Sequence, residues 1–434
     1  MRWKSDRYTG WGRVIEAEGD LARPERLSAL RDLPPTPAIG ARRSYGDACL
    51  NSDGRAVDMT RLDRVLSFDP ATGVVEAEAG VPIGELARLF VPRGWIPAVM
   101  PGTGFATVGG CIAMDVHGKN HHRDGAFGAH VLSITLVHQG KFKTITPDKN
   151  PTLFRATTGG MGQTGMIVSA RLQMAACSGE TMKVRESRAG DLDEHLALLD
   201  ASDATYTVGW IDAAAKGAAL GRGIIEEGEH SLDPAPRPGK PKSVPFNAPH
   251  FALSKPIVKA FNARYYGRVP EGGRTRFRTV EDFFFPLDRV LNWNRLYGKR
   301  GFHQFQCVLP TGEVAVLREL LEVIARSGLA SPLAVLKRLG PQGDGLMSFP
   351  MEGYTLAVDF PNRDRALDMI RFLGTKAGQA GGRVYLAKDS LADGAIVRQM
   401  YPGHAKWAAE AAKADPKRQL ETDLTRRLGL RSVS

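Results

Sequence analysis

Short apolar runs separated by turn residues dominate residues 56–100. Runs at 65–68 and 74–79 flank a Pro-Ala-Thr-Gly turn, which predicts a β-hairpin. Residues 82–91 have a proline in their first turn and a glycine shortly after their end, which predicts a helix. Further strands are predicted at 56–59 and 96–100. Strand runs with one short helix favour an α+β domain over a regular βαβ repeat.

The second half of the chain continues this mixture of strands and helices. A β-branched run predicts a strand at 166–172. Residues 305–309 and 355–360 are predicted strands, and residues 314–325 are a predicted helix between them. This order suits a sheet that helices cover on one face. Two proline-rich, polar stretches are predicted loops, residues 233–248 and 268–273.

The chain has 434 residues, of which 43% are hydrophobic and 24% charged, as in a globular protein of two or three domains. Its four cysteines form no C-x-x-C pair and are expected to be reduced thiols. The first residues lack the apolar stretch of a signal peptide. The chain contains no run of ~18 apolar residues, so no membrane span is predicted. We therefore expect a cytoplasmic or membrane-peripheral protein.

The formal charge of +11 is concentrated in the middle of the chain. Residues 216–300 contain 16 Lys and Arg against 8 Asp and Glu, a surplus of 8. A solvated basic face explains such a surplus, and so does contact with anionic lipid headgroups or a lipid phosphate. Nucleic acid is not expected as a partner, because no helix-turn-helix, zinc finger or RNP pattern occurs.

Residues 101–130 combine many glycines with four histidines and lack the periodicity of a long helix. Glycine lets backbone N–H groups converge on an anion, as a bound pyrophosphate requires. An earlier stretch, residues 36–51, has a short apolar run, two arginines and a Ser-Tyr-Gly-Asp turn. Each stretch alone is typical of a surface turn. Together they favour a dinucleotide cofactor held along its length.

Residues 160–165 match the pattern G-x-G-x-x-G but do not fit a Rossmann fingerprint. That fingerprint requires a helix to open at the third glycine, whereas a predicted strand follows here. We interpret these residues as a tight turn between strands. No Walker A pattern occurs in the chain, which argues against an NTPase.

The strings RRSYGD, PGT with TVGG, DVHGKNHH and GGMGQTG resemble those of the vanillyl-alcohol-oxidase (PCMH-type) family of FAD-dependent oxidases. The HGKNHH and AKDS strings narrow the resemblance to the polyprenylphosphoryl-ribose 2'-oxidases of that family, over nearly the whole chain. The resemblance implies an α+β fold with a two-part PCMH-type FAD-binding domain, residues 1–178 and 381–434. Between the two parts it implies a substrate domain, residues 179–380, with a mainly antiparallel sheet covered by helices.

The resemblance also implies an activity, the FAD-dependent oxidation of the 2'-hydroxyl of a polyprenylphosphoryl-β-D-ribose to its 2'-keto form. This is the first half of an epimerisation to the arabinose form, which a short-chain NAD(P)H-dependent keto-reductase partner would complete. The basic middle segment favours this lipid-linked substrate and an anionic membrane surface as partners. One alternative is an aldonolactone or alditol oxidase acting on a soluble sugar. Another is a flavin-free binding protein that keeps the fold as a scaffold.

Individual site residues follow from the same resemblance. The FAD is expected to be non-covalent, because residues 41–45 lack the histidine to which many family members attach it. The implied cofactor-binding residues are Arg43, Ser44, Tyr45, Gly46, Asp47, Gly102, Thr107, Val108, Gly109, Gly110, Met114, His117, Gly118, Ile167 and Tyr385. The implied substrate-binding residues are Gln304, Gln306, Lys337, Thr355 and Lys388.

Lys388, His117 and Tyr45 are the catalytic residues that the resemblance implies. Beside the flavin, Lys388 either stabilises the reduced ring as a cation or accepts the hydroxyl proton, if burial lowers its pKa. His117 is expected on the isoalloxazine side of the substrate pocket. His117 and His121 have the spacing of metal ligands on a helix. No carboxylate or thiol completes a ligand set, so no metal site is predicted.

One string departs from the resemblance. The typical mycobacterial pattern Trp-Asn-x-Cys is Tyr354-Thr355-Leu356-Ala357 in this chain. The reactive cysteine is therefore absent, which leaves the fine substrate preference open without affecting the fold or the flavin. Cys307 is the nearest cysteine in sequence, and strand alternation predicts that it points away from the face of Gln306.

Overall fold

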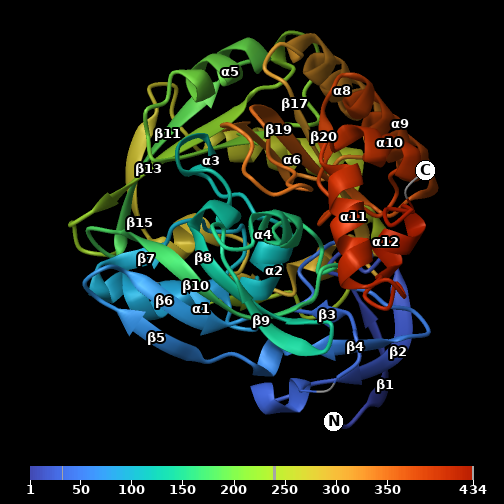
Figure 1. Ribbon diagram of the computed structural model, residues 1–434. Helices are drawn as coiled ribbons and strands as arrows, with labels where there is room; N and C mark the ends of the chain where they lie inside the picture. Colours follow the sequence, from blue (N-terminus) through green and yellow to red (C-terminus); the bar gives the residue numbers. More distant parts are fainter. Residues whose placement is uncertain (32, 238–240, 433–434) are drawn as a thin grey trace.

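The structure is a computed structural model that describes residues 1–31, 33–237 and 241–432. Its strands form three main sheets that follow one another along the chain (Figure 1). The first sheet mixes parallel and antiparallel pairs and is built from the N-terminal residues. Its order is β1 (Lys4–Thr9), β2 (Glu16–Ala22), β4 (Arg55–Asp58) and β3 (Ala38–Ile39).

The second sheet is antiparallel and contains the predicted hairpin. Its order is β5 (Val65–Asp69), β6 (Val74–Glu78), β10 (Met166–Ala176), β8 (Val131–His138) and β9 (Lys141–Ile145), with β7 (Trp95–Pro97) paired to the end of β10. The α-helices of this part are α1 (Ile83–Phe90), α2 (Val108–Ala113), α3 (His121–Asp124) and α4 (Pro151–Thr157). Buried apolar residues of α1 and α2 share one core with this sheet.

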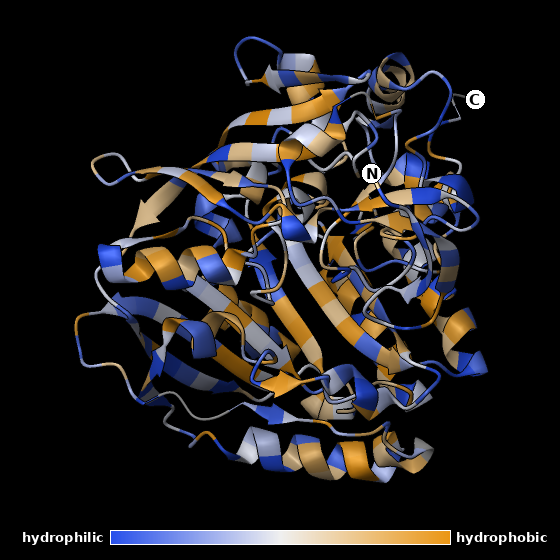
Figure 2. Ribbon diagram, turned by 90° about the horizontal axis from the view of Figure 1, so that it is seen from below, coloured by the Kyte–Doolittle hydropathy of each residue, from blue (hydrophilic) through white to orange (hydrophobic). Residues whose placement is uncertain are grey.

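The third sheet is the largest and is antiparallel throughout. Its order is β15 (Arg274–Thr279), β11 (Thr181–Ala189), β13 (Gly223–Ser231), β12 (Tyr206–Ile211), β18 (Ala334–Leu339), β19 (Gly353–Pro361), β17 (Phe302–Leu309) and β20 (Arg383–Val384). Three helices cover its outer face in Figure 1, α5 (Leu192–Asp200), α8 (Val314–Ser327) and α9 (Asp364–Gln379). The long strands inside the molecule are mostly apolar, whereas the outer helices mix apolar and polar positions (Figure 2).

Strand alternation divides the residues of β17 between the two faces of this sheet. Phe305 and Cys307 belong to the core beneath the helices. Gln304 and Gln306 lie on the opposite face, where they line a cavity. The prediction that Cys307 points away from Gln306 is therefore confirmed.

The C-terminal helices α10 (Gly394–Met400), α11 (His404–Ala414) and α12 (Asp423–Arg427) lie between the third sheet and the N-terminal sheet (Figure 1). Arg427 of α12 makes ion pairs with Asp47 at 2.7 Å and with Asp389 at 2.8 Å. Trp407 of α11 is fully buried in the core of the third sheet. The end of the chain thus binds both its beginning and its middle.

The remaining elements lie in the basic middle segment. They are α6 (Lys255–Gly267), α7 (Val280–Phe284) and the parallel pair β14 (Lys242–Ser243) and β16 (Val290–Leu291). Among the described residues, no helix is long and apolar enough to cross a membrane.

The α+β class, the hairpin and the helices near 82–91 and 314–325 are confirmed. Three local predictions were wrong. The strand at 96–100 ends at Pro97, because β7 pairs only with the last residues of β10. The turn at 160–165 follows helix α4 rather than a strand. The predicted loop 233–248 contains β14, and its residues 238–240 lie outside the described residues. The domain boundaries remain a prediction.

Candidate functional site

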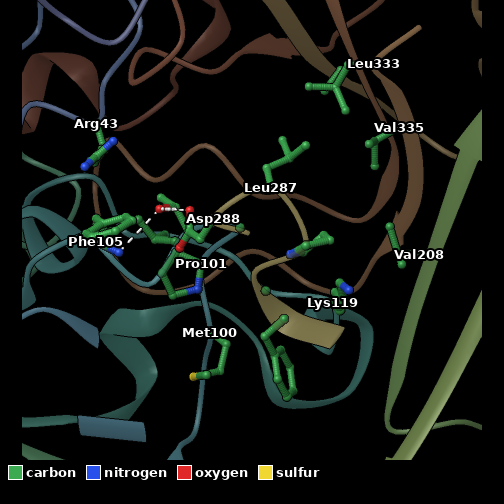
Figure 3. A pocket seen from close by; sticks show the side chains of 18 of the residues that line it. Arg43, Met100, Pro101, Phe105, Lys119, Val208, Leu287, Asp288, Leu333 and Val335 are labelled. Atoms are coloured by element: carbon green, nitrogen blue, oxygen red, sulfur yellow. Dashed lines mark hydrogen bonds between the residues drawn. The ribbon is translucent and has the colours of Figure 1, made fainter. Parts of the chain in front are cut away.

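A cavity of about 1040 Å³ lies where the two glycine-rich stretches meet the open face of the third sheet. Its volume slightly exceeds the ~300–1,000 Å³ usual for small-molecule sites. Figure 3 shows Arg43, Phe105 and Asp288 on one side of the cavity and Val208 and Val335 on the other. Such a volume accommodates a dinucleotide together with a second molecule.

Fourteen of the predicted site residues line this one cavity, although they come from distant parts of the chain. They are Arg43, Ser44, Tyr45, Gly102, Thr107, Gly110, Met114, His117, Gly118, Gln304, Gln306, Lys337, Tyr385 and Lys388. Six others do not line it, namely Gly46, Asp47, Val108, Gly109, Ile167 and Thr355.

Those six residues have other contacts. The carboxylate of Asp47 is held by Arg427. A Cβ on Gly46 would meet the Asp389 carbonyl oxygen at 1.9 Å, so only glycine fits there. The N–H groups of Val108 and Gly109 donate to backbone carbonyls of the neighbouring strand region. Ile167 is buried within β10, and the hydroxyl of Thr355 contacts Gln306.

Unpaired backbone donors lie along the two glycine-rich stretches. The N–H groups of Arg43, Ser44, Gly102 and Thr103 donate to no acceptor among the described residues. A Cβ on Gly102 would meet open space, so the bare backbone faces the cavity at this point. Backbone N–H groups require a partner, and several aimed at one space form an anion-binding concavity. This surface fits the pyrophosphate of a dinucleotide.

Arg43 lies between two aromatic rings at the same end of the cavity. Its guanidinium carbon is 4.2 Å from the ring centre of Trp11 and 4.4 Å from that of Phe105. Asp288 enters from the middle segment and accepts hydrogen bonds from the Thr103 hydroxyl at 2.8 Å and the Gly104 N–H at 2.7 Å (Figure 3). Stacking holds the guanidinium in place without neutralising its charge.

Gln306 is the centre of a buried hydrogen-bond chain. Its Nε2 lies 3.1 Å from both His117 Nε2 and Thr355 Oγ1. The Thr355 hydroxyl in turn donates to the Cys307 carbonyl at 2.8 Å. Because that hydroxyl has used its only proton, it must accept from the Gln306 amide, which orients the amide toward His117. His117 Nε2 is therefore the acceptor of the second Gln306 proton.

His117 is held as a neutral imidazole. Burial lowers its pKa well below the usual 6.5, and the charges of Lys337 and Lys388 act in the same direction. Its Nδ1 is buried with no hydrogen-bond partner among the described residues, and its ring packs near Phe349 and Tyr385. Neither ring nitrogen is thus available to accept a proton from a substrate. The hydrogen bond that the ring makes is with Gln306.

Lys388 and Tyr45 are in contact in the cavity wall. The ammonium nitrogen of Lys388 lies 3.6 Å from the centre of the Tyr45 ring. Burial lowers the pKa of Lys388 to about 7, against the raising effect of Asp359. Burial also raises the pKa of Tyr45 well above 10, so its hydroxyl stays protonated. The lysine can therefore change its charge near neutral pH while the tyrosine cannot.

Sequence reasoning missed Asp359 and Tyr297. Asp359 is fully buried, and its carboxylate accepts hydrogen bonds from the Gln304 amide and from the Tyr297 hydroxyl at 2.9 Å. Burial raises the pKa of Asp359 to about 7. Asp359 lies in the Val-Asp-Phe-Pro string of residues 358–361, directly after Ala357, where this chain differs from the family pattern. Its place beside that difference was the signal that the sequence offered.

Lys119 is a third missed residue and lies within the HGKNHH string. Its ammonium donates to the backbone carbonyl of Phe283 and lies 3.9 Å from the centre of the Phe283 ring. Burial lowers its pKa to about 8 and that of Lys337 to about 7. Among the described residues, neither these two amines nor Lys388 makes a salt bridge. The cavity thus holds three amines available to an anionic ligand.

Comparisons with known proteins agree with this site. The FAD binding domain family matches residues 26–144, which include both glycine-rich stretches. Decaprenylphosphoryl-β-D-ribose oxidase of Mycolicibacterium smegmatis is 36% identical over 98% of this chain and 97% of its own length. An uncharacterized protein of Streptomyces coelicolor is 32% identical over 81% of this chain and its whole length.

A more distant likeness extends over the full chain as well. L-gulono-1,4-lactone dehydrogenase of Mycobacterium tuberculosis is 22% identical over 97% of this chain and 98% of its own length. The protein is an FAD-dependent oxidoreductase, because its dinucleotide cavity, the matching domain and the full-length relative agree. The chain belongs to the family of FAD-binding oxidoreductases that includes decaprenylphosphoryl-β-D-ribose oxidase.

Proposed function

We propose that this protein oxidises the 2'-hydroxyl of a polyprenylphosphoryl-β-D-ribose to the 2'-keto form. The observation that carries the proposal is the composition of one cavity, in which two amides and three amines without a salt bridge among the described residues lie near the dinucleotide loops. Amides suit a pentose hydroxyl array, and amines suit a phosphate diester. The relative in Mycolicibacterium smegmatis, whose name states such a substrate, supports the choice.

FAD supplies the hydride acceptor when it is bound. The 2'-hydroxyl must also lose its proton, and a base with a pKa near the working pH is most effective. Lys388 meets this requirement because burial lowers its pKa to about 7. We assign proton acceptance to the Lys388 Nζ rather than to His117, whose Nε2 is bonded to Gln306 and whose Nδ1 is buried.

Gln304, Gln306 and Lys337 hold the substrate in this proposal. Gln306 is oriented by Thr355 and His117, and Gln304 is oriented by Asp359. Holding an amide in place before the substrate arrives lowers the entropic cost of positioning the reacting carbon. Lys337 and Lys119 supply positive charge for the phosphate.

The wider setting is also part of the proposal. The keto product would pass to a short-chain NAD(P)H-dependent keto-reductase, which would complete the epimerisation to the arabinose form. The lipid chain of the substrate requires access from a membrane, so the protein is expected at an anionic membrane surface. The surplus of 8 positive charges in residues 216–300 supports this expectation.

Anaerobic flavin bleaching tests the proposal. The holoenzyme is mixed with polyprenylphosphoryl ribose, polyprenylphosphoryl arabinose, ribose 5-phosphate and L-gulono-1,4-lactone, and flavin absorbance is followed. Rapid bleaching by the lipid-linked ribose alone is the expected result. Bleaching by the lactone and not by the lipid-linked pentose would replace the proposal with a soluble-sugar oxidase.

A further inference from the structure

Exposed large apolar side chains are concentrated in one part of the chain. Of the fourteen that are exposed among the described residues, eight belong to residues 232–296. Phe246 and Phe251 are the most exposed aromatic residues, at 70% and 68%. The others in this segment are Leu232, Ile257, Phe261, Phe277, Leu291 and Leu296. Single exposed apolar residues are ordinary, but a cluster of this size indicates an interaction surface.

Helix α6 shows how the chain builds this surface. Val258 and Asn262 are its buried residues, so the helix rests on the protein by a narrow stripe. Ile257 and Phe261 are exposed at 45% and 48% and lie one turn apart on its outer side. The exposed positions between and beside them include Lys255, Lys259 and Arg264. The outer side of α6 therefore presents two apolar side chains among basic ones, which suits contact with anionic lipid headgroups.

Charge extends the same pattern beyond the helix. Residues 234–270 contain seven Lys and Arg and no Asp or Glu. A second copy of this chain docked on the same face would place two basic surfaces against each other, which opposes self-association. An anionic bilayer has the complementary charge, and its acyl chains accept apolar side chains.

This surface reaches the cavity. Phe277 and Leu291 are exposed at 43% and 42%, and both also line the cavity. Leu291 lies in β16, which pairs with β14 shortly before Phe246. Tyr265 of helix α6 and Arg268, which directly follows the helix, line the cavity. The segment that carries the exposed apolar and basic side chains therefore also forms part of the cavity wall.

We propose that this face docks on an anionic bilayer, with Phe246, Phe251 and the Ile257–Phe261 stripe of α6 inserted among the headgroups and the cavity mouth turned toward the lipid. The docking face is inferred from its exposed apolar residues and its charge alone. Its purpose, to admit a lipid-linked pentose without withdrawing the chain from the bilayer, rests on the proposed function.

Vesicle flotation of the FAD-loaded protein tests the docking face. The vesicles contain phosphatidylcholine alone or with phosphatidylglycerol. The variant Phe246→Ser/Phe251→Ser/Phe261→Ser removes the apolar anchors, and Lys255→Glu/Lys259→Glu reverses two charges. The control is Phe142→Ser/Phe372→Ser, because these phenylalanines are also exposed, at 40% and 42%, but lie in β9 and α9.

We expect the wild type and the control to float with the anionic vesicles, and the anchor variant to lose at least about tenfold in partitioning. The charge variant should lose binding at low salt and become less sensitive to added salt. Full retention of binding by the anchor variant, or an equal loss in the control, would overturn the proposal. So would light scattering that shows a dimer of the wild type which the anchor variant cannot form.

Flavin content and bleaching keep this test separate from the proposed function. Each variant should retain its FAD absorbance, which reports on folding. A short-chain, water-soluble phosphoryl-ribose analogue should bleach the flavin of the anchor variant as fast as that of the wild type. Lost flotation with normal bleaching supports the docking face, whereas normal flotation without bleaching by any pentose refutes the proposed function only.

Discussion

The ammonium nitrogen of Lys388 lies 3.6 Å from the centre of the Tyr45 ring, although the two residues are near opposite ends of the chain. This contact holds the amine in the cavity wall, where we propose that it accepts the substrate proton. We expect Lys388→Met to retain FAD and to reduce it about 10²–10⁴-fold more slowly, as the loss of a general base requires. Stopped-flow flavin reduction measures this rate. Near-normal reduction in the variant would make Lys388 a bystander.

The pH dependence of flavin reduction distinguishes the two roles of this lysine. The pKa of Lys388 is lowered to about 7, so its neutral form increases as the pH rises through 7. A base must be neutral, and the rate should therefore rise with pH below about 7 and level off above it. Lys388→Arg should lack this limb. A rate that falls as the pH rises through 7 would show that the lysine acts as a cation instead.

Asp359 should tune that limb without contacting the substrate. Its negative charge raises the pKa of Lys388, in opposition to burial. We expect Asp359→Asn to lower the pKa of Lys388 and to move the rising limb of the pH profile toward acid. Tyr297→Phe, which removes one hydrogen bond to the same carboxylate, is the milder comparison. If the rising limb of the pH profile is not shifted in Asp359→Asn, then Asp359 does not influence the pKa of Lys388.

Thr355 should act through Gln306. Thr355→Val removes the hydroxyl that orients the Gln306 amide, while Thr355→Ser keeps it. A buried amide that loses a partner costs about a tenfold change in equilibrium. We expect kcat/KM to fall about tenfold in the valine variant, with FAD content unchanged, and to recover in the serine variant. Equal kinetics for the Thr355→Val and Thr355→Ser variants would show that the Thr355 hydroxyl does not position Gln306.

The FAD is expected to be released by acid precipitation. Residues 41–45 contain no histidine, and Cys49, which lines the cavity, has a thiol whose pKa burial raises to about 12. The protonated Cys49 thiol is therefore a poor nucleophile for attachment. The supernatant should be yellow after precipitation, with a colourless pellet. Colour that stays with the denatured chain would mean a covalent flavin.

Ala357 should make the protein resistant to inhibitors that capture a cavity cysteine at this position. Ala357 lines the cavity, whereas Cys307 faces the helix-covered core and burial raises the pKa of its thiol to about 12. Mass spectrometry after incubation with such an inhibitor and substrate should show an unmodified chain. Ala357→Cys should gain the adduct. Modification of Cys307 in the unaltered chain would contradict this account of the strand.

Local patterns were sufficient for the parts of the site that a short segment builds by itself. Both glycine-rich stretches contribute residues to the cavity, and so do residues 117–119 and the Gln304-x-Gln306 pair, which the family resemblance had indicated. Glycine spacing sets where backbone can approach a ligand, and strand alternation sets which side chains share a face. Both are properties of neighbouring residues, so the sequence alone determines them.

Contacts between distant segments decided the rest. The same short string placed Ser44 on the cavity and turned Asp47 toward Arg427 of the last helix. Thr355 lies behind the amide that it orients, and Asp359 meets Tyr297 only because β19 brings the chain back beside the middle segment. The lowered pKa of Lys388 likewise comes from burial. Desolvation depends on everything packed around a group, which no local pattern specifies.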